Sequence, residues 1–192
     1  YIQFLTKLRI LVKEQSQRWD LNSESARHRI YRLLYGTRSA LEEVMLQVPS
    51  NSFSSLIPGF DEPSQTPSTK LLGVTIHSGD ILVSRGGYPT SALIARGNDY
   101  PGNFSHVALV HVNEKTNSAS VIESHIERGV AIASLQDYLN DQKLRVMVLR
   151  LRSDLPALVK DPMLPHKVAS SALVEAQRNH IPYDFEMDFR DP

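Results

Sequence analysis

Three of the seven histidines fall in two neighbouring segments that have the pattern of β-strands. His106 and His111 lie in residues 105–112, and His125 lies in residues 119–126. The other four occupy ordinary places in a helix, a turn or beside a helix end: His28, His77, His166 and His180. Because imidazole exchanges a proton near neutral pH, the neighbours of the three strand histidines decide what chemistry they can perform.

Alternation along the two strands sorts these histidines by face. His106 shares its face with Ala108, whereas His111 points to the opposite face. A polar turn at residues 113–118 predicts a β-hairpin that sets residues 106–112 opposite residues 119–125. The spacing therefore predicts that Glu123 or His125 lies beside His106.

A histidine that is held by a carboxylate can act as a general base, because the carboxylate fixes the orientation of the imidazole. Two other interpretations stay open at this point. An ordinary polar pair on an exposed sheet face is favoured by the spacing alone. A metal site built from His106, Glu123 and His125 is the least favoured, because the separations lack the spacing of helical zinc motifs.

The elements that must position these residues can be read from the periodicity of apolar side chains. Residues 2–19 and 23–48 have helical spacing and predict an antiparallel helical hairpin, residues 1–48. Residues 49–70 are rich in Ser, Thr and Pro and predict a linker. Residues 71–192 form the main domain, with strands at 72–76, 80–85, 105–112, 119–126, 129–133 and 143–151, and helices at 90–96, 135–139 and 166–179. This order predicts an α+β fold with an antiparallel sheet.

Composition narrows the classes of function. The chain has 192 residues, a mass of 21.6 kDa and a net charge of zero, so we expect no nucleic-acid partner. It has no apolar run long enough to span a membrane, and we expect no transmembrane segment. It contains no cysteine, which excludes disulfides and any thiol chemistry by these residues themselves.

Five segments in order resemble a known family over about residues 72–192. They read GDILVSRG, FSHVALVHVN, VIESHIERGVAIASLQDYL, LRLR and IPYDF. The series is similar to the permuted papain-like hydrolases, the YiiX/YaeF-type branch of the NlpC-type cysteine peptidase superfamily. The resemblance implies a permuted papain-like domain in which His106 is the general base and Glu123 orients it. It further implies that Tyr183 and His125 line the site and support the oxyanion, without a cofactor or metal.

The same resemblance implies a nucleophilic cysteine at the start of a helix, where the helix dipole and the histidine lower the pKa of a thiol. We expect this cysteine beyond residue 192, with a second chain as one alternative and a non-catalytic binding module as another. The implied substrate is a cell-wall peptide or an acyl-amide or lipid-like molecule, and the cell envelope is favoured over the cytoplasm. Without the nucleophile helix, we expect Ala108 or Val110 to be unusually exposed, or another chain to fill the gap.

Overall fold

The computed structural model describes residues 1–48, 59, 61–96 and 103–185, and the chain divides into two compact units, Tyr1–Phe53 and Ser54–Pro192. The first unit contains two helices that pack against each other, α1 (Ile2–Ser16) and α2 (Glu24–Gln47). Both predicted helices are therefore present. The first ends earlier than predicted, so that Trp19 lies in the connecting turn, where its side chain is exposed.

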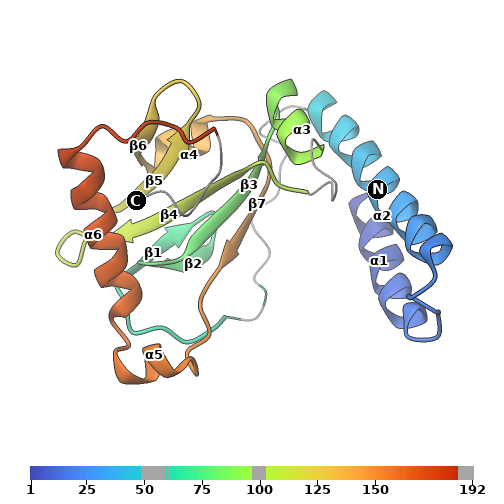
Figure 1. The fold of residues 1–192 in the computed structure, drawn as a ribbon, viewed down its shortest axis with the longest axis horizontal. Helices are drawn as coiled ribbons and strands as arrows, with labels where there is room; N and C mark the ends of the chain where they lie inside the picture. The colour runs from blue at the N-terminus through green and yellow to red at the C-terminus, as the bar shows by residue number, and fades with distance from the viewer. Residues whose placement is uncertain (49–58, 60, 97–102, 186–192) are drawn as a thin grey trace. The chain divides into compact units, whose positions relative to one another are not determined.

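The second unit is built on a five-stranded antiparallel sheet (Figure 1). Its strands are β3 (Ile81–Gly86), β4 (His106–Val112), β5 (Ala119–His125), β6 (Gly129–Ser134) and β7 (Lys143–Leu149), in the spatial order β6-β5-β4-β3-β7. The α+β class and the antiparallel sheet are as predicted. β7 returns to pair with β3, which places the strand that carries His106 in the middle of the sheet.

A separate two-stranded hairpin precedes the sheet. It consists of β1 (Ser68–Leu71) and β2 (Val74–His77), joined by Leu72 and Gly73. Both joining residues have positive φ values of 46° and 88°, as a two-residue type I′ turn requires. The strand predicted at 72–76 is present as β2, but it begins at Val74 because residues 72 and 73 form the turn. β1 was not predicted, and residues 68–70, which we assigned to the linker, belong to it.

The core fills one face of the five-stranded sheet. Leu71 and Ile76 of the β1–β2 hairpin and Tyr138 of α4 (Leu135–Asn140) pack against Leu82, Ala108, Val110, Val112 and Val121. Ala108 is 3% exposed and Val110 is fully buried, so the expectation that these side chains would be uncovered was wrong. The physical reason is that the hairpin and α4 cover this face of the sheet.

Helix α6 (Leu164–Arg178) packs against β4, β5 and β6, and follows the short helix α5 (Pro156–Lys160). Helix α3 (Pro89–Arg96) packs against β3. The N-terminus of α6 lies so close to the turn before β3 that a Cβ on Gly79 would stand 2.3 Å from Cβ of Pro165, and Gly79 has a φ of 94°. Glycine is required there for both reasons. None of the helices in the described ranges is long and apolar enough to cross a membrane.

Candidate active site

The centre of the candidate site is a hydrogen bond between a histidine and a buried carboxylate. His106 Nε2 lies 2.6 Å from Oε2 of Glu123, and His125 Nε2 lies 3.2 Å from Oε1 of the same carboxylate. The contact between His125 and Glu123 does not have the geometry of a hydrogen bond. Glu123 is 5% exposed, whereas the His106 side chain is 25% exposed. The predicted adjacency of His106 and Glu123 is confirmed, and one edge of the imidazole reaches the surface.

Strand register explains why these side chains meet. β4 and β5 are antiparallel with Ala108 opposite Glu123, so His106 is diagonal to Glu123 on the same face. Continuation of that register sets His125 across from His106, and the two rings are 5.7 Å apart. On the other neighbouring strand, β3, Ser84 is the residue directly opposite His106 in the register. The alternation of side chains along two strands is therefore enough to build this cluster.

Opposing effects act on the Glu123 carboxyl. Burial raises its pKa, but the hydrogen bond from His106 and the electrostatic interactions with His106 and His125 lower it, so the pKa lies below its ordinary value. Glu123 is thus ionised at neutral pH and can only accept hydrogen bonds. Consequently His106 carries its proton on Nε2, and Nδ1 is the ring atom that can take a proton from another group.

Three buried hydroxyls belong to Ser84, the register partner of His106, to Ser105, which precedes His106 in the chain, and to Tyr138 of α4. Ser84 Oγ, Ser105 Oγ and Tyr138 Oη have no hydrogen bond of good geometry in the described part of the chain. Burial raises the pKa of Tyr138 to about 12, the charge of Glu123 adds to this rise, and the Ser84 hydroxyl opposes it. The phenol is therefore neutral at physiological pH. Sequence reasoning did not find these residues; the alternation of β3 and β4 could have indicated Ser84, which shares a face with His106.

Tyr183 lies beyond α6, in a segment that is anchored to β6. The N–H of Val130 donates to the carbonyl of Ile181 at 2.8 Å, and a Cβ on Gly129 would stand 2.0 Å from that oxygen. Gly129 is the register partner of His125, so the segment passes the end of β5 that carries His125. The Tyr183 ring contacts Phe185 edge-on at 5.0 Å. Within the described residues, no hydrogen bond or ring contact joins Tyr183 to His106 or Glu123.

A second histidine pair lies on the opposite face of the sheet. The rings of His111 and His166 stack with centroids 5.4 Å apart. Ser78 Oγ accepts from the N–H of Val112 and is hydrogen-bonded to Nδ1 of His166 at 2.9 Å, and His166 Nε2 is 3.3 Å from Oε1 of Glu114. Burial and the charge of His166 lower the pKa of His111. These contacts hold the start of α6 against β4. The position of His166 near a helix end did not reveal this role in the sequence.

The Gly-Asp dipeptide before β3 also has a structural role. Asp80 is 1% exposed, and its two carboxylate oxygens accept from Nε and Nη2 of Arg150 at 2.8 and 2.9 Å. Oδ2 also accepts from the N–H of His77. The ion pair ties the end of β7 to the turn between β2 and β3. It lies outside the cluster formed by His106 and Glu123.

The geometry does not support a metal centre. Within residues 1–48, 59, 61–96 and 103–185, no set of His, Asp or Glu side chains is arranged to hold a metal ion. Around Glu123 the two imidazoles face separate oxygens of one carboxylate, whereas metal ligands must face a common point.

The antiparallel sheet and the helices that accompany it give this domain an α+β architecture. A family model described as permuted papain-like amidase enzyme, YaeF/YiiX, C92 family, matches residues 75–190, and the chain belongs to this family. No curated protein and no solved structure matches the chain. The family places the protein among amidase-type hydrolases, and the match contains the whole five-stranded sheet and the His106–Glu123 pair.

Proposed function

We propose that the protein hydrolyses an amide bond through a Cys–His–Glu site in which His106 is the general base and Glu123 its orienting partner. The observation that carries the proposal is the 2.6 Å hydrogen bond from His106 Nε2 to Glu123. It fixes the tautomer and leaves Nδ1 for the thiol. The thiol itself comes from outside these 192 residues, since the sequence contains no cysteine.

The proposed reaction has two halves that share one base. In the first, Nδ1 of His106 takes the thiol proton, the thiolate attacks the carbonyl carbon, and the imidazolium protonates the departing amine as the C–N bond breaks. In the second, His106 takes a proton from water, hydroxide displaces the thiolate from the acyl group, and the imidazolium returns the proton to sulfur. Glu123 stabilises the imidazolium in both halves without accepting its proton.

We assign supporting roles to two further residues. His125 contacts the second oxygen of Glu123 at 3.2 Å, so it restrains the carboxylate. Tyr183 is carried by the segment anchored to β6, and we propose that its phenol donates to the oxyanion when a substrate is bound. We also propose that residues 1–48 are a helical appendage and that the hydrolase domain begins with β1 at Ser68, so that the connection predicted at residues 49–70 ends before that strand.

A second function, of a different class, is a binding module that keeps the pocket but performs no hydrolysis. The absence of cysteine from the sequence favours it. Under this alternative, the His106–Glu123 pair would hold a ligand by hydrogen bonds instead of activating a nucleophile. The ligand class is the same in both cases: a peptide, an acyl-amide or a lipid-like molecule.

The test is a comparison of turnover among variants of the full gene product. Hydrolysis of short peptides, N-acyl amides and lipid esters is measured for the unchanged protein and for His106→Ala. His28→Ala, which replaces a histidine of the first unit, is the control. General base catalysis contributes on the order of 100- to 10,000-fold, so His106→Ala loses activity by that factor and His28→Ala retains it. Tight binding of one of these compounds without turnover would instead establish the binding module.

A further inference from the structure

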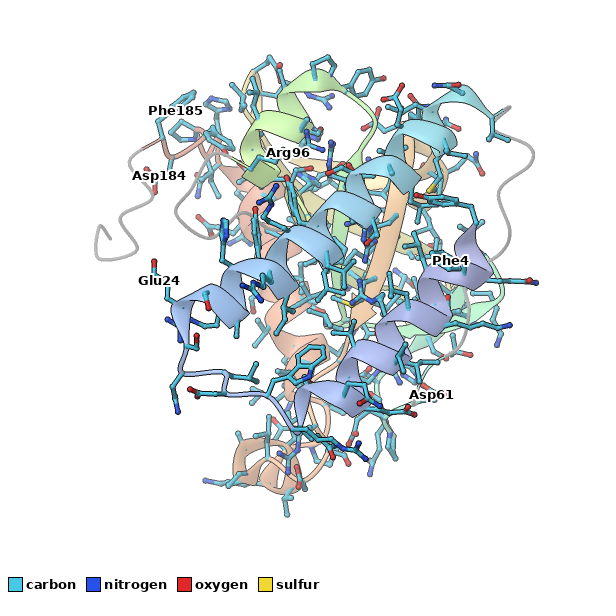
Figure 2. The ribbon with its side chains drawn as sticks, turned by 90° about the vertical axis from the view of Figure 1, so that its right-hand side faces the viewer. Phe4, Glu24, Asp61, Arg96, Asp184 and Phe185 are labelled. Atoms are coloured by element: carbon cyan, nitrogen blue, oxygen red, sulfur yellow. The ribbon has the colours of Figure 1, made fainter. Side chains whose placement is uncertain are left out.

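The helical hairpin of the first unit leaves much apolar surface exposed. Among the described apolar side chains of α1 and α2, only Leu5 and Val12 are buried. Side chains that remain exposed include Phe4, Ile10, Leu11, Trp19, Leu21 and Tyr31; Phe4 is labelled on α1 in Figure 2. Exposed apolar side chains mark an interaction site where they are gathered into one surface.

A groove of about 630 Å³ runs between α1 and α2. We call it the hairpin groove, defined by Val12, Ile30 and Leu34 at its floor and by Ile10, Leu21 and Tyr31 at its rim. The floor residues are buried or half-buried, whereas the three rim side chains are exposed. The groove therefore offers an apolar surface that is open on one side.

Cations border this groove without acidic partners. Arg9, Lys13 and Arg27 line it, and no Asp or Glu belongs to its lining. Arg9 and Lys13 stand one helical turn apart, which weakens a helix by repulsion, and neither forms an ion pair within the described residues. Arg27 is held by the carbonyls of Leu21 and Asn22. Residues 1–48 carry an excess of three cations, although the whole chain has no net charge.

We propose that the hairpin groove binds the surface of an anionic membrane. Arg9 and Lys13 contact lipid phosphates, while Ile10, Leu21 and Tyr31 enter the boundary between head groups and acyl chains. A second copy of the hairpin would bring like charges together at the groove. A partner helix would require one continuous apolar seam, whereas here cations interrupt the apolar rim. The proposal is independent of the hydrolase chemistry.

The experiment is sedimentation of the 192-residue chain with phosphatidylcholine vesicles that contain or lack phosphatidylglycerol. Binding is expected only to the anionic vesicles, and it weakens as salt is added. Trp19 is the only tryptophan and lies in the turn beside the groove, so its fluorescence shifts to shorter wavelength on binding. This shift reports the hairpin itself and distinguishes it from adsorption through another surface.

Two pairs of variants locate the binding surface. Arg9→Gln with Lys13→Gln weakens partition onto anionic vesicles roughly thirtyfold, since each cation near such a surface adds about a factor of five. The matched control, Arg29→Gln with Arg32→Gln, removes two exposed cations of α2 outside the groove and has a several-fold smaller effect. Glutamine preserves helix propensity, and circular dichroism checks that the helices persist.

Three results would overturn the proposal. The first is no sedimentation with anionic vesicles at low salt. The second is that the control pair weakens vesicle binding as much as Arg9→Gln with Lys13→Gln does, which would show that only the net charge of the hairpin matters. The third is a concentration-dependent dimer that Ile10→Ser abolishes, which would assign the groove to a second copy of the chain.

Discussion

Replacing Glu123 by Gln removes the charge that orients His106 while keeping the size of the side chain. The hydrogen bond between them is 2.6 Å long, and the carboxylate is almost fully buried. A hydrogen bond to a charged group contributes about 1.5–3 kcal/mol. The out-of-line contact with His125 adds less, because His125 is not fully buried and solvent screens such pairs. We therefore expect Glu123→Gln to lower the free energy of unfolding by about 2 kcal/mol at pH 7.

The sign of the pH dependence follows from the lowered pKa of Glu123. A carboxyl whose pKa is lower in the folded state contributes stability above its unfolded value, here 4.5, and loses it as the pH falls through the folded value. The deficit of Glu123→Gln should therefore shrink once the pH falls below about 4.5. Urea unfolding of the 192-residue chain across this range measures it. The exposed Glu127→Gln, in the turn after β5, is the matched control and should leave stability unchanged.

Equal stability of Glu123→Gln and the unchanged chain at pH 7 would refute this reasoning. A deficit of the same size at all pH values would also refute it, since that result would point to packing and not to charge. In the same samples, the ¹⁵N shifts of His106 should show a hydrogen on Nε2 in the unchanged chain and a mixture of tautomers in Glu123→Gln.

Three further variants test the parts that position the site. The pKa of His111 is lowered in the folded state, so the protein loses stability as the pH falls below 6.5, the ordinary pKa of histidine. His111→Phe should reduce this dependence of the unfolding free energy on pH by up to about 1.4 kcal/mol per pH unit, measured by urea unfolding between pH 7 and 5. An unchanged pH dependence would contradict this prediction. Asp80→Asn removes the buried carboxylate partner of Arg150, which keeps only the exposed Asp61, and should cost about 3 kcal/mol. Asp154→Asn, in an exposed pair, should cost under about 1 kcal/mol. Similar losses would show that the buried pair has no special role. Gly79→Ala has no room for its Cβ and a positive φ, so its melting temperature should fall by several degrees, and an unchanged melting temperature would disprove the close approach of α6.

The sequence was sufficient to predict that His106 and Glu123 approach each other, because alternation along two strands is a local property. The parity of residues 106–112 and 119–125 predicted the approach of His106 and Glu123, and the structure has them hydrogen-bonded. The same reasoning found no partner for His111, because its neighbour His166 arrives on a distant helix. Contacts that depend on how a remote element packs leave no spacing signal.

The covering of the sheet was the least predictable part of the fold. The composition of residues 49–70 indicated a linker, but β1 begins directly after Pro67 and supplies Leu71 to the core. A four-residue strand of mixed polarity does not differ from a loop in its pattern. As a result the burial of Ala108 and Val110 could not be foreseen, since it depends on the β1–β2 hairpin.

The most direct test of the central claim is trapping of the acyl-enzyme. The full gene product is mixed with an activated acyl ester and its intact mass is recorded over time. We predict one acyl group per chain on a cysteine, formed at least about 100-fold more slowly in His106→Ala. Acylation at an unchanged rate in His106→Ala, or its complete absence from the unchanged protein, would contradict the assignment of His106 as the base of a cysteine hydrolase.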